Sequence, residues 1–195
     1  MHLLRYATLV AFSAATLVAS DDALQRFHGT YRGMKSISFS FTGGGVSAGT
    51  MLAKRGGMYR VSIGDRTVVS NGKMVWNATP STKTVIISDY KPSSAEVSIE
   101  RVFFDVMSVY RSTITSQAGG TINVRLDAPG PQAQIAGITS VDLTCDTKLV
   151  VKKVRIASNG AISEFTISKL SINPHISDRT FTYDVPRGWQ SLDIR

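Results

Sequence analysis

Apolar and polar residues alternate along most of the chain, and this pattern predicts a protein built mainly of β-strands. The clearest example is residues 49–76, where Tyr59, Val61 and Ile63 alternate with polar or small residues. A period of two places the apolar side chains on one face of a strand. The pair Asn71-Gly72 is typical of a tight hairpin. The stretch therefore predicts an antiparallel β-meander with one apolar face.

The same alternation recurs before and after this meander. Phase changes within residues 149–156 and 162–172 predict β-bulges that bend the sheet. With the meander, the chain contains about ten predicted strands, and open twisted sheets of that size tend to curl or split. The further predicted strands are Ile37–Phe41, Val46–Lys54, Lys83–Asp89, Ile122–Leu126, Val141–Cys145, Leu149–Ile156, Ile162–Ile172 and Phe181–Val185.

A first amphipathic helix is predicted directly after Asp21 and Asp22. Carboxylates favour a helix N-terminus, and apolar residues then recur every three or four positions. The pattern covers about 14 residues, or about four turns. The apolar stripe consists of Leu24, Phe27, Tyr31 and Met34.

A second helix is predicted from Ser94 to Tyr110, with Ser93 or Ser94 as its cap and Glu96 in its first turn. It lies between strands, after Pro92 and before the Ser/Gly-rich residues 112–120, so it is placed to act as a lid. The apolar residues assigned to the lid are Val102, Phe103, Val106, Met107 and Tyr110.

Two helices cannot cover a flat sheet of this size. We therefore predict a mainly β (α+β) fold: a strongly curved, unclosed antiparallel β-barrel of about 10–11 strands, with the helices covering its concave face. A length of 195 residues with 43% hydrophobic residues suits a single domain. No repeat or linker argues for a second one.

The first twenty residues have the features of a secretory signal peptide. A short positive head ends at Arg5, an apolar segment follows, and small residues precede Asp21. We expect cleavage after Ser20, which leaves residues 21–195 as the mature domain. The alternative is a membrane anchor, but about 14 apolar residues fall short of the ~20 that a spanning helix needs.

Charge and cysteine content narrow the function classes. The net formal charge is +8, scattered along the chain, and its densest run is Lys148–Arg155 on a predicted strand. We interpret that run as the solvated face of a sheet. A surface for an acidic partner or anionic lipid is the second interpretation, and nucleic acid is a distant third because no recognition motif accompanies the charge. The single Cys145 excludes an internal disulfide and is predicted to be a buried, inert thiol.

Apolar residues on the predicted inner face could form either a packed core or a hollow cavity. Barrels wide enough to leave space inside commonly hold ligands, and an apolar lining selects acyl chains. The alternation pattern leaves both possibilities open. The candidate cavity residues are Phe39, Phe41, Tyr59, Val61, Ile63, Trp76, Val85, Ile87, Val124, Val141 and Leu143.

Several short motifs resemble the LolA-type outer-membrane lipoprotein carriers. The closest match is Ser70-Asn71-Gly72-Lys73-x-x-Trp76, which follows Gly49, Lys54-Arg55 and Met58-Tyr59 in the family order. The resemblance returns at residues 159–165, a Gly-containing hairpin before a late strand. It returns again at Phe181-x-Tyr183-x-x-Pro186-x-Gly188. The likeness covers essentially the whole predicted mature chain.

The resemblance implies a periplasmic, monomeric carrier without a cofactor. Such a carrier takes the acyl chains of a lipoprotein from an inner-membrane transporter and passes them to an outer-membrane acceptor lipoprotein. Arg55 matches the family Arg that bonds to the lid in the closed state. The chain departs from the family pattern by having Gly56 after that Arg, where Pro is usual, and Asn71 where Asp is usual. Its next strand also lacks the usual Trp.

Two other function classes compete with a carrier. An enzyme or a metal site is disfavoured because His28 and His175 have neither a nucleophile motif nor a ligand partner at suitable spacing. A lipid-binding sensor or scaffold module of the same fold, with a different amphiphilic ligand, remains an alternative because a fold does not determine a function.

Overall fold

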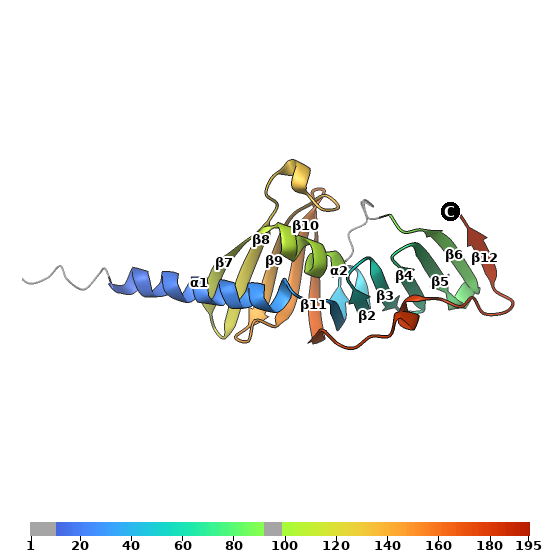
Figure 1. Cartoon of the computed structure of the whole chain (residues 1–195), viewed down its shortest axis with the longest axis horizontal. Coiled ribbons are helices and arrows are strands. Elements are labelled where there is room, and N and C mark those ends of the chain that lie inside the picture. The colour runs from blue at the N-terminus through green and yellow to red at the C-terminus, as the bar shows by residue number, and fades with distance from the viewer. Residues whose placement is uncertain (1–10, 92–98) are drawn as a thin grey trace, which may run out of the picture.

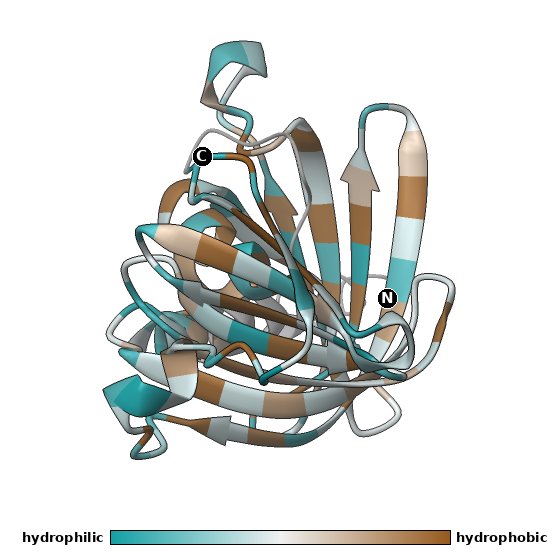
Figure 2. Ribbon diagram, turned by 90° about the vertical axis from the view of Figure 1, so that its right-hand side faces the viewer, coloured by the Kyte–Doolittle hydropathy of each residue, from teal (hydrophilic) through white to brown (hydrophobic). Residues whose placement is uncertain are grey.

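The computed structural model describes residues 11–91 and 99–195, and within these ranges twelve strands form one sheet. The strand order is β12-β6-β5-β4-β3-β2-β1-β11-β10-β9-β8-β7. All neighbours are antiparallel except β12 and β6, and the end strands β12 and β7 do not pair with each other. The predicted mainly β, curved and unclosed sheet is confirmed. Figure 2 shows its strands running in different directions at the two ends.

The strand bounds agree with most of the sequence pattern. The strands are β1 (Ser36–Gly43), β2 (Val46–Lys54), β3 (Met58–Ile63), β4 (Arg66–Asn71), β5 (Met74–Thr79), β6 (Thr84–Asp89), β7 (Arg111–Ala118), β8 (Thr121–Asp127), β9 (Ile138–Asp146), β10 (Val151–Ser158), β11 (Ala161–Ile172) and β12 (Gln190–Asp193).

Both predicted β-bulges are present. On β10 the pairing with β9 slips between Val151 and Lys153. On β11 the pairing with β1 slips opposite Ser38 and Ser40, where Lys169 has a positive φ of 52°. A bulge adds one residue to one strand and increases the local twist. The bulges therefore account for part of the curvature of the sheet.

Two helical segments lie over the half of the sheet formed by β7–β11 (Figure 1). Helix α1 (Ala11–Tyr31) begins ten residues before the predicted start, and its first part projects beyond the sheet. The second segment contains α2 (Ile99–Arg101), the π-helical turn η2 (Val102–Val106) and α3 (Met107–Val109). We call residues 99–110 the lid segment. The predicted cap at Ser93 or Ser94, and Glu96, lie outside the described residues.

The half of the sheet under the helices is solidly packed. Phe103 of the lid segment is fully buried, with its ring 6.3 Å from that of Tyr31 in α1 and 5.3 Å from that of Phe39 in β1. The Tyr31 hydroxyl donates to the carbonyl of Leu149 and accepts from the amide of Val151. A buried tyrosine with both hydrogen bonds made fixes α1 on the sheet.

The C-terminal segment covers the opposite face of β3–β6. This segment contains the 3-10 turn η4 (Asp178–Phe181) and then crosses the sheet to β12. Arg60 of β3 holds it by donating to the carbonyls of Thr180 and Thr182. Tyr183 and Trp189 pack onto a small second core on this face. The prediction of a strand at residues 181–185 is therefore wrong, because these residues pack through side chains and pair with no strand.

Two strands were missed by the sequence pattern. Residues 112–120 were assigned to no strand, but most of them belong to β7, an edge strand whose side chains are mainly exposed. Because an edge strand facing water needs few apolar residues, its Ser- and Thr-rich sequence hides it. β12 is only four residues long and entirely exposed, and it is held by backbone pairing with β6.

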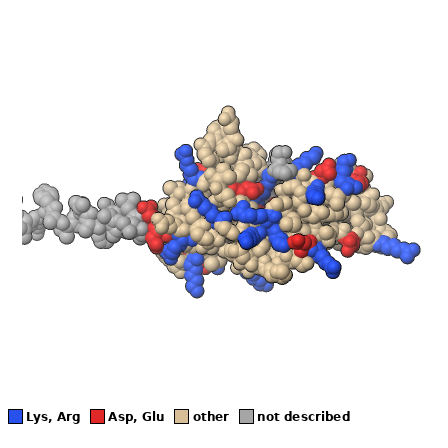
Figure 3. Space-filling view, in the orientation of Figure 1, with Lys and Arg blue, Asp and Glu red and all other residues tan. Residues whose placement is uncertain are grey.

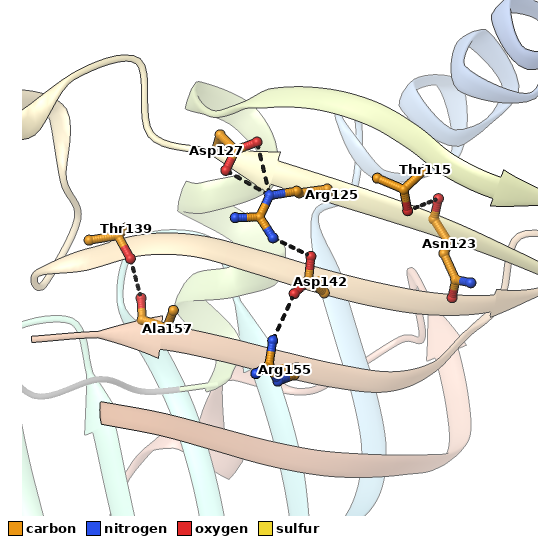
Figure 4. A network of polar contacts seen from close by, with 8 residues as sticks. All are labelled: Thr115, Asn123, Arg125, Asp127, Thr139, Asp142, Arg155 and Ala157. Carbon is orange, nitrogen blue, oxygen red and sulfur yellow. Dashed lines mark hydrogen bonds and ion pairs between the residues drawn. The ribbon is translucent and has the colours of Figure 1, made fainter. Parts of the chain in front are cut away.

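Charged residues on the outer face of β8–β10 pair across the strands (Figure 4). Arg125 contacts Asp127 and Asp142 at 3.0 Å, and Arg155 contacts Asp142 at 3.3 Å. Lys152 and Lys153 are also exposed. The run of basic residues is therefore the solvated face of a sheet, and exposed pairs of this kind contribute only about 0–1 kcal/mol each.

Candidate ligand cavity

A cavity of about 580 Å³ lies over the half of the sheet that α1 does not cover. Its volume falls within the range of about 300–1,000 Å³ that is typical of small-molecule sites. Strands β1 to β6, β11 and the first turn of the lid segment supply its walls. The apolar lining residues are Phe41, Val46, Met51, Tyr59, Val61, Ile63, Val68, Val75, Ile86, Ile99 and Phe165.

Four of the eleven candidate cavity residues line this cavity: Phe41, Tyr59, Val61 and Ile63. Four others are buried in the packed half of the molecule, where the side chains of the helices fill the concave face. Alternation along a strand identifies an inner face, but it does not show what lies against that face. These four residues are Phe39, Val124, Val141 and Leu143.

The remaining three candidates, Trp76, Val85 and Ile87, lie on the opposite face of the sheet and do not line the cavity. They belong to the second core, beneath Tyr183 and Trp189. The prediction that they face the interior is wrong. Both faces of β5 and β6 carry apolar residues, because one face lines the cavity and the other packs beneath the C-terminal segment. The large Trp76 was therefore assigned to the wrong face.

Sequence analysis missed seven of the apolar lining residues. Val68 is the clearest of them, because it pairs directly with Val61 across β3 and β4. Residues opposite each other in an antiparallel pair point to the same face. Once Val61 is assigned to the cavity, the hairpin register assigns Val68 to it as well. The missed residues are Val46, Met51, Val68, Val75, Ile86, Ile99 and Phe165.

At one end the cavity meets a smaller, polar pocket of about 80 Å³. The two spaces share Tyr90, Glu100 and Arg101, which we call the neck. Lys54, Arg55 and Asp105 are the other charged residues of the small pocket. The site therefore has a large apolar compartment and a small polar one, which is an arrangement suited to an amphiphile.

Glu100 is the most unusual residue of the neck. It is only 8% exposed, and its Oε2 atom has no hydrogen-bond partner within the described part of the chain. Burial disfavours the charged form and raises the pKa of Glu100 to about 7. The adjacent Arg101 only partly opposes this shift. The sequence alone does not single out this residue, because an acidic residue within a predicted amphipathic helix is ordinary.

Glu100→Gln is expected to change the pH dependence of stability. Because the folded-state pKa of about 7 lies above the ordinary value of 4.5, the folded protein holds an extra proton between these pH values. As the pH rises from about 4.5 to about 7, the free energy of unfolding of the wild type should therefore fall by about 3 kcal/mol relative to that of the variant. Denaturant titrations of both proteins from pH 4 to pH 8.5 measure the difference. A difference that is independent of pH would show that Glu100 is not buried in this way.

Arg55 links three parts of the structure beside the neck. Its guanidinium donates to the carbonyls of Met34 and Arg32 after α1, at 2.6 and 3.0 Å. It also donates to the carbonyl of Phe104 in the lid segment, at 3.5 Å, and lies 5.6 Å from the centre of the Phe104 ring. The structure thus places the predicted latch residue against the lid segment. Lys and Arg side chains gather across the middle of this face of the molecule (Figure 3).

The five predicted lid residues all pack downward into the filled half of the sheet. Each is at most 2% exposed, and the Tyr110 hydroxyl donates to the carbonyl of Ile138. Only the first turn of the lid segment, Ile99 to Arg101, borders the cavity. The N-terminal turn of the lid segment therefore forms one side wall of the cavity, and the five predicted lid residues do not line it. The five residues are Val102, Phe103, Val106, Met107 and Tyr110.

The strongest family-like motif shapes a hairpin. The side chain of Asn71 accepts hydrogen bonds from the amides of Lys73 and Met74, and Ser70 Oγ accepts from the amide of Gly72. A Cβ atom on Gly72 would lie 2.3 Å from the carbonyl oxygen of Gly56. The motif therefore positions β4 and β5 relative to the β2–β3 turn, and thereby shapes one wall of the cavity.

The histidine and cysteine side chains that could have catalytic roles, His28 and Cys145, instead pack within the fold. His28 Nε2 lies 2.6 Å from Ser112 Oγ, where α1 crosses β7. Cys145 is fully buried, and burial raises its pKa to about 12. A thiol with such a pKa is not a nucleophile at neutral pH. Across the described residues, no group of three or more His, Cys, Asp or Glu side chains could hold a metal ion.

Comparison with known proteins gives one family. The family model for the outer membrane lipoprotein carrier protein LolA matches residues 41–184. This match includes the cavity lining, Arg55, the lid segment and the first part of the closing motif, up to residue 184. No curated protein sequence matches the chain.

Several solved structures are similar to this chain at low sequence identity. An uncharacterized conserved protein from Thermus thermophilus aligns with a TM-score of 0.52 and 12% identity, over 89% of this chain and 98% of that chain. A LolA superfamily protein from Nitrosomonas europaea aligns with a TM-score of 0.43 and 10% identity, over 84% and 97% of the two chains. A DUF1329 family protein from Desulfovibrio piger aligns with a TM-score of 0.41 and 11% identity, over 84% of this chain and 95% of that chain.

Proposed function

Because the chain belongs to the LolA family of outer membrane lipoprotein carrier proteins, we propose that it shields the acyl chains of lipoproteins and carries them between membranes. The observation that supports this most directly is the 580 Å³ cavity with eleven apolar lining residues. Each buried CH₂ group is stabilised by about 0.8 kcal/mol, so acyl chains do not leave a membrane for water unaided. A cavity of this kind replaces the membrane during transfer.

The proposed transfer breaks no covalent bond and needs no cofactor. The donor is a lipoprotein-releasing transporter in the inner membrane, and the recipient is an acceptor lipoprotein in the outer membrane. The carrier acts as a monomer in the periplasm, where proteins of this family reside. From Ala11 to Lys91 and from Ile99 to Arg195, no helix is long and apolar enough to cross a membrane.

Cleavage of a signal peptide after Ser20 is part of this proposal. Such a cut would leave α1 beginning at Asp21 and Asp22, whose carboxylates favour a helix N-terminus. The contacts of α1 with the packed half would be kept, because Ala23, Phe27 and Tyr31 are the buried residues of the described part of α1. N-terminal sequencing of the exported protein tests the position of the cut.

A dye-displacement experiment tests the carrier function. Residues 21–195 are loaded with an environment-sensitive hydrophobic dye and titrated with an acylated lipopeptide, and with the same peptide lacking its acyl chains. Displacement by the acylated peptide alone is expected, because only acyl chains compete for the apolar cavity. Equal displacement by both peptides, or no binding of the dye, would contradict the proposal and favour a structural or protein-binding role.

Arg55→Met is expected to loosen the lid segment. The substitution removes the hydrogen bond and the cation–π contact with Phe104 of the lid segment, and also the two hydrogen bonds that hold Arg55 to the chain after α1. Hydrogen bonds to charged groups contribute about 1.5–3 kcal/mol each. Because Arg55 is partly exposed, we expect a net effect equivalent to about tenfold in the opening equilibrium. Hydrogen exchange of the amides in residues 99–110, and the release rate of a bound acyl probe, should both rise by about this factor.

Arg60→Met is the matched control for this prediction. Arg60 also donates to two backbone carbonyls, but on the opposite face of the sheet, at Thr180 and Thr182. Its loss should increase hydrogen exchange near η4 and leave the lid segment and probe release unchanged. If both variants release the probe equally fast, Arg55 stabilises the fold in general and does not act as a latch.

A further inference from the structure

The neck carries a hydrogen-bonding group whose partner is absent from the described residues. Glu100 is more than nine-tenths buried and lines both the apolar cavity and the small polar pocket, and its buried Oε2 atom has no hydrogen-bond partner among the described residues. A buried acceptor without a partner costs about 1–3 kcal/mol, and more when it is charged. Native proteins contain few such groups, and each requires an explanation.

The neighbouring charged groups are already engaged with other partners. Arg101 forms an ion pair with Asp105 at 4.0 Å and a side-chain hydrogen bond with Tyr90. Lys54, in the small pocket, pairs with Asp178 at the surface. Arg55, as described above, donates to backbone carbonyls. Among the charged residues of the neck and the small pocket, Glu100 is therefore the one with a buried side-chain oxygen that lacks a hydrogen bond within the described part of the chain.

Tyr90 is held in place by the turn beneath it. A Cβ atom on Gly57 would lie 2.4 Å from the Tyr90 ring, so the ring rests directly on the backbone of this turn. The amide of Tyr90 also donates to the carbonyl of Lys73 at 2.8 Å. The neck thus has a rigid wall opposite the lid segment. A ligand group reaching Glu100 would pass between Tyr90 and the lid segment.

We propose that Glu100 accepts a hydrogen bond from an N–H group at the polar end of an amphiphile whose hydrocarbon chain occupies the apolar cavity. This inference rests on the proposed function in one respect, namely that acyl chains bind in that cavity. Above its pKa of about 7, the Glu100 carboxylate has acceptor sites only, so at about pH 8 it distinguishes head groups that donate N–H from those that do not. The chemical class selected is an amide-linked acyl chain or an ammonium head group, in preference to an ester or a quaternary ammonium.

Two pairs of probes with identical chains test this selectivity and separate its two sources. Dodecanamide and methyl dodecanoate differ in whether the polar end donates N–H. Lysophosphatidylethanolamine and lysophosphatidylcholine with the same acyl chain differ in whether the ammonium group carries N–H. The dissociation constant of each probe is measured by dye competition. The wild type should bind the donor of at least one pair about tenfold more tightly. A preference within the first pair assigns amides, and one within the second pair assigns ammonium groups.

Glu100→Leu should reduce that preference to less than about twofold. Glu100→Gln keeps a carbonyl acceptor of the same size, so it should retain part of the preference. Glu164→Leu is the matched control, because Glu164 is exposed on β11 and outside both pockets. It should behave as the wild type does.

The outcomes separate failure of this inference from failure of the proposed function. If the wild type binds both members of each pair equally, acyl chains still bind and the role of Glu100 is overturned. The same conclusion follows if Glu100→Leu keeps the full preference. If the wild type binds none of the four probes, the proposed function itself fails and this inference fails with it.

Discussion

Val61→Trp is expected to lower the affinity for an acyl probe by about 100-fold. Val61 lies at the centre of the cavity wall, because its register partners Met51 and Val68 on the two adjacent strands also line the cavity. An indole at this position would exclude about four methylene groups of a bound chain. At about 0.8 kcal/mol for each CH₂, the loss is about 3 kcal/mol. Dye competition with an acylated lipopeptide measures it.

The same substitution should leave the fold intact. Val61 is only half-buried, so the added ring would enter open space and should change the free energy of unfolding by less than about 1 kcal/mol. Val185→Trp is a suitable control because Val185 is 38% exposed in the C-terminal segment, away from the cavity. It should bind the probe as the wild type does. Unchanged binding by Val61→Trp would mean that acyl chains occupy another place.

The overall architecture could be predicted because curvature and closure follow from strand number and bulges. About ten strands with two helices cannot form a covered flat sheet, and the bulges at Lys152 and Lys169 lie within the two stretches where they were predicted. The strands that escaped prediction, β7 and β12, are the two ends of the sheet. Edge strands are stabilised by backbone pairing more than by burial, so they leave a weak hydrophobic pattern.

The cavity was harder to predict than the fold because side-chain alternation does not report what covers a face. Phe39 and Phe41 lie on the same face of β1, yet Phe39 packs against the lid segment while Phe41 lines the cavity. The difference lies in how far the lid segment extends over the sheet. Trp76 shows the second difficulty, since the C-terminal segment covers it from the opposite face. Neither cover could be located without the tertiary structure.

Glu100 illustrates a third kind of residue, whose importance depends on its surroundings. In the sequence it is one acidic residue within the amphipathic helix predicted from Ser94 to Tyr110, which is a common position for a charged side chain. In the structure it is buried between two pockets, beside an Arg that is already paired with Asp105. Arg55, in contrast, was found from the sequence through its resemblance to a family motif. Its contact with the Phe104 carbonyl is present.

The largest expected effect on stability lies in the filled half of the sheet, under the helices, and not in the hollow half that contains the cavity. Phe103→Ala should lower the free energy of unfolding by about 3–5 kcal/mol, because the ring is completely buried between Tyr31 and Phe39. Losing it would detach the lid segment from both α1 and the sheet. Denaturant unfolding at fixed pH measures the change.

Phe165→Ala is the matched control, since it deletes the same ring from the hollow half. Phe165 is half-buried at the cavity wall, and its main aromatic contact is Phe41, with ring centres 6.0 Å apart. One side of its ring already borders open space, so its removal should cost only about 1–2 kcal/mol. Equal destabilisation by the two substitutions would show that the cavity is packed. A difference of at least about 2 kcal/mol is expected if the filled half stabilises the fold and the hollow half is kept open for ligand.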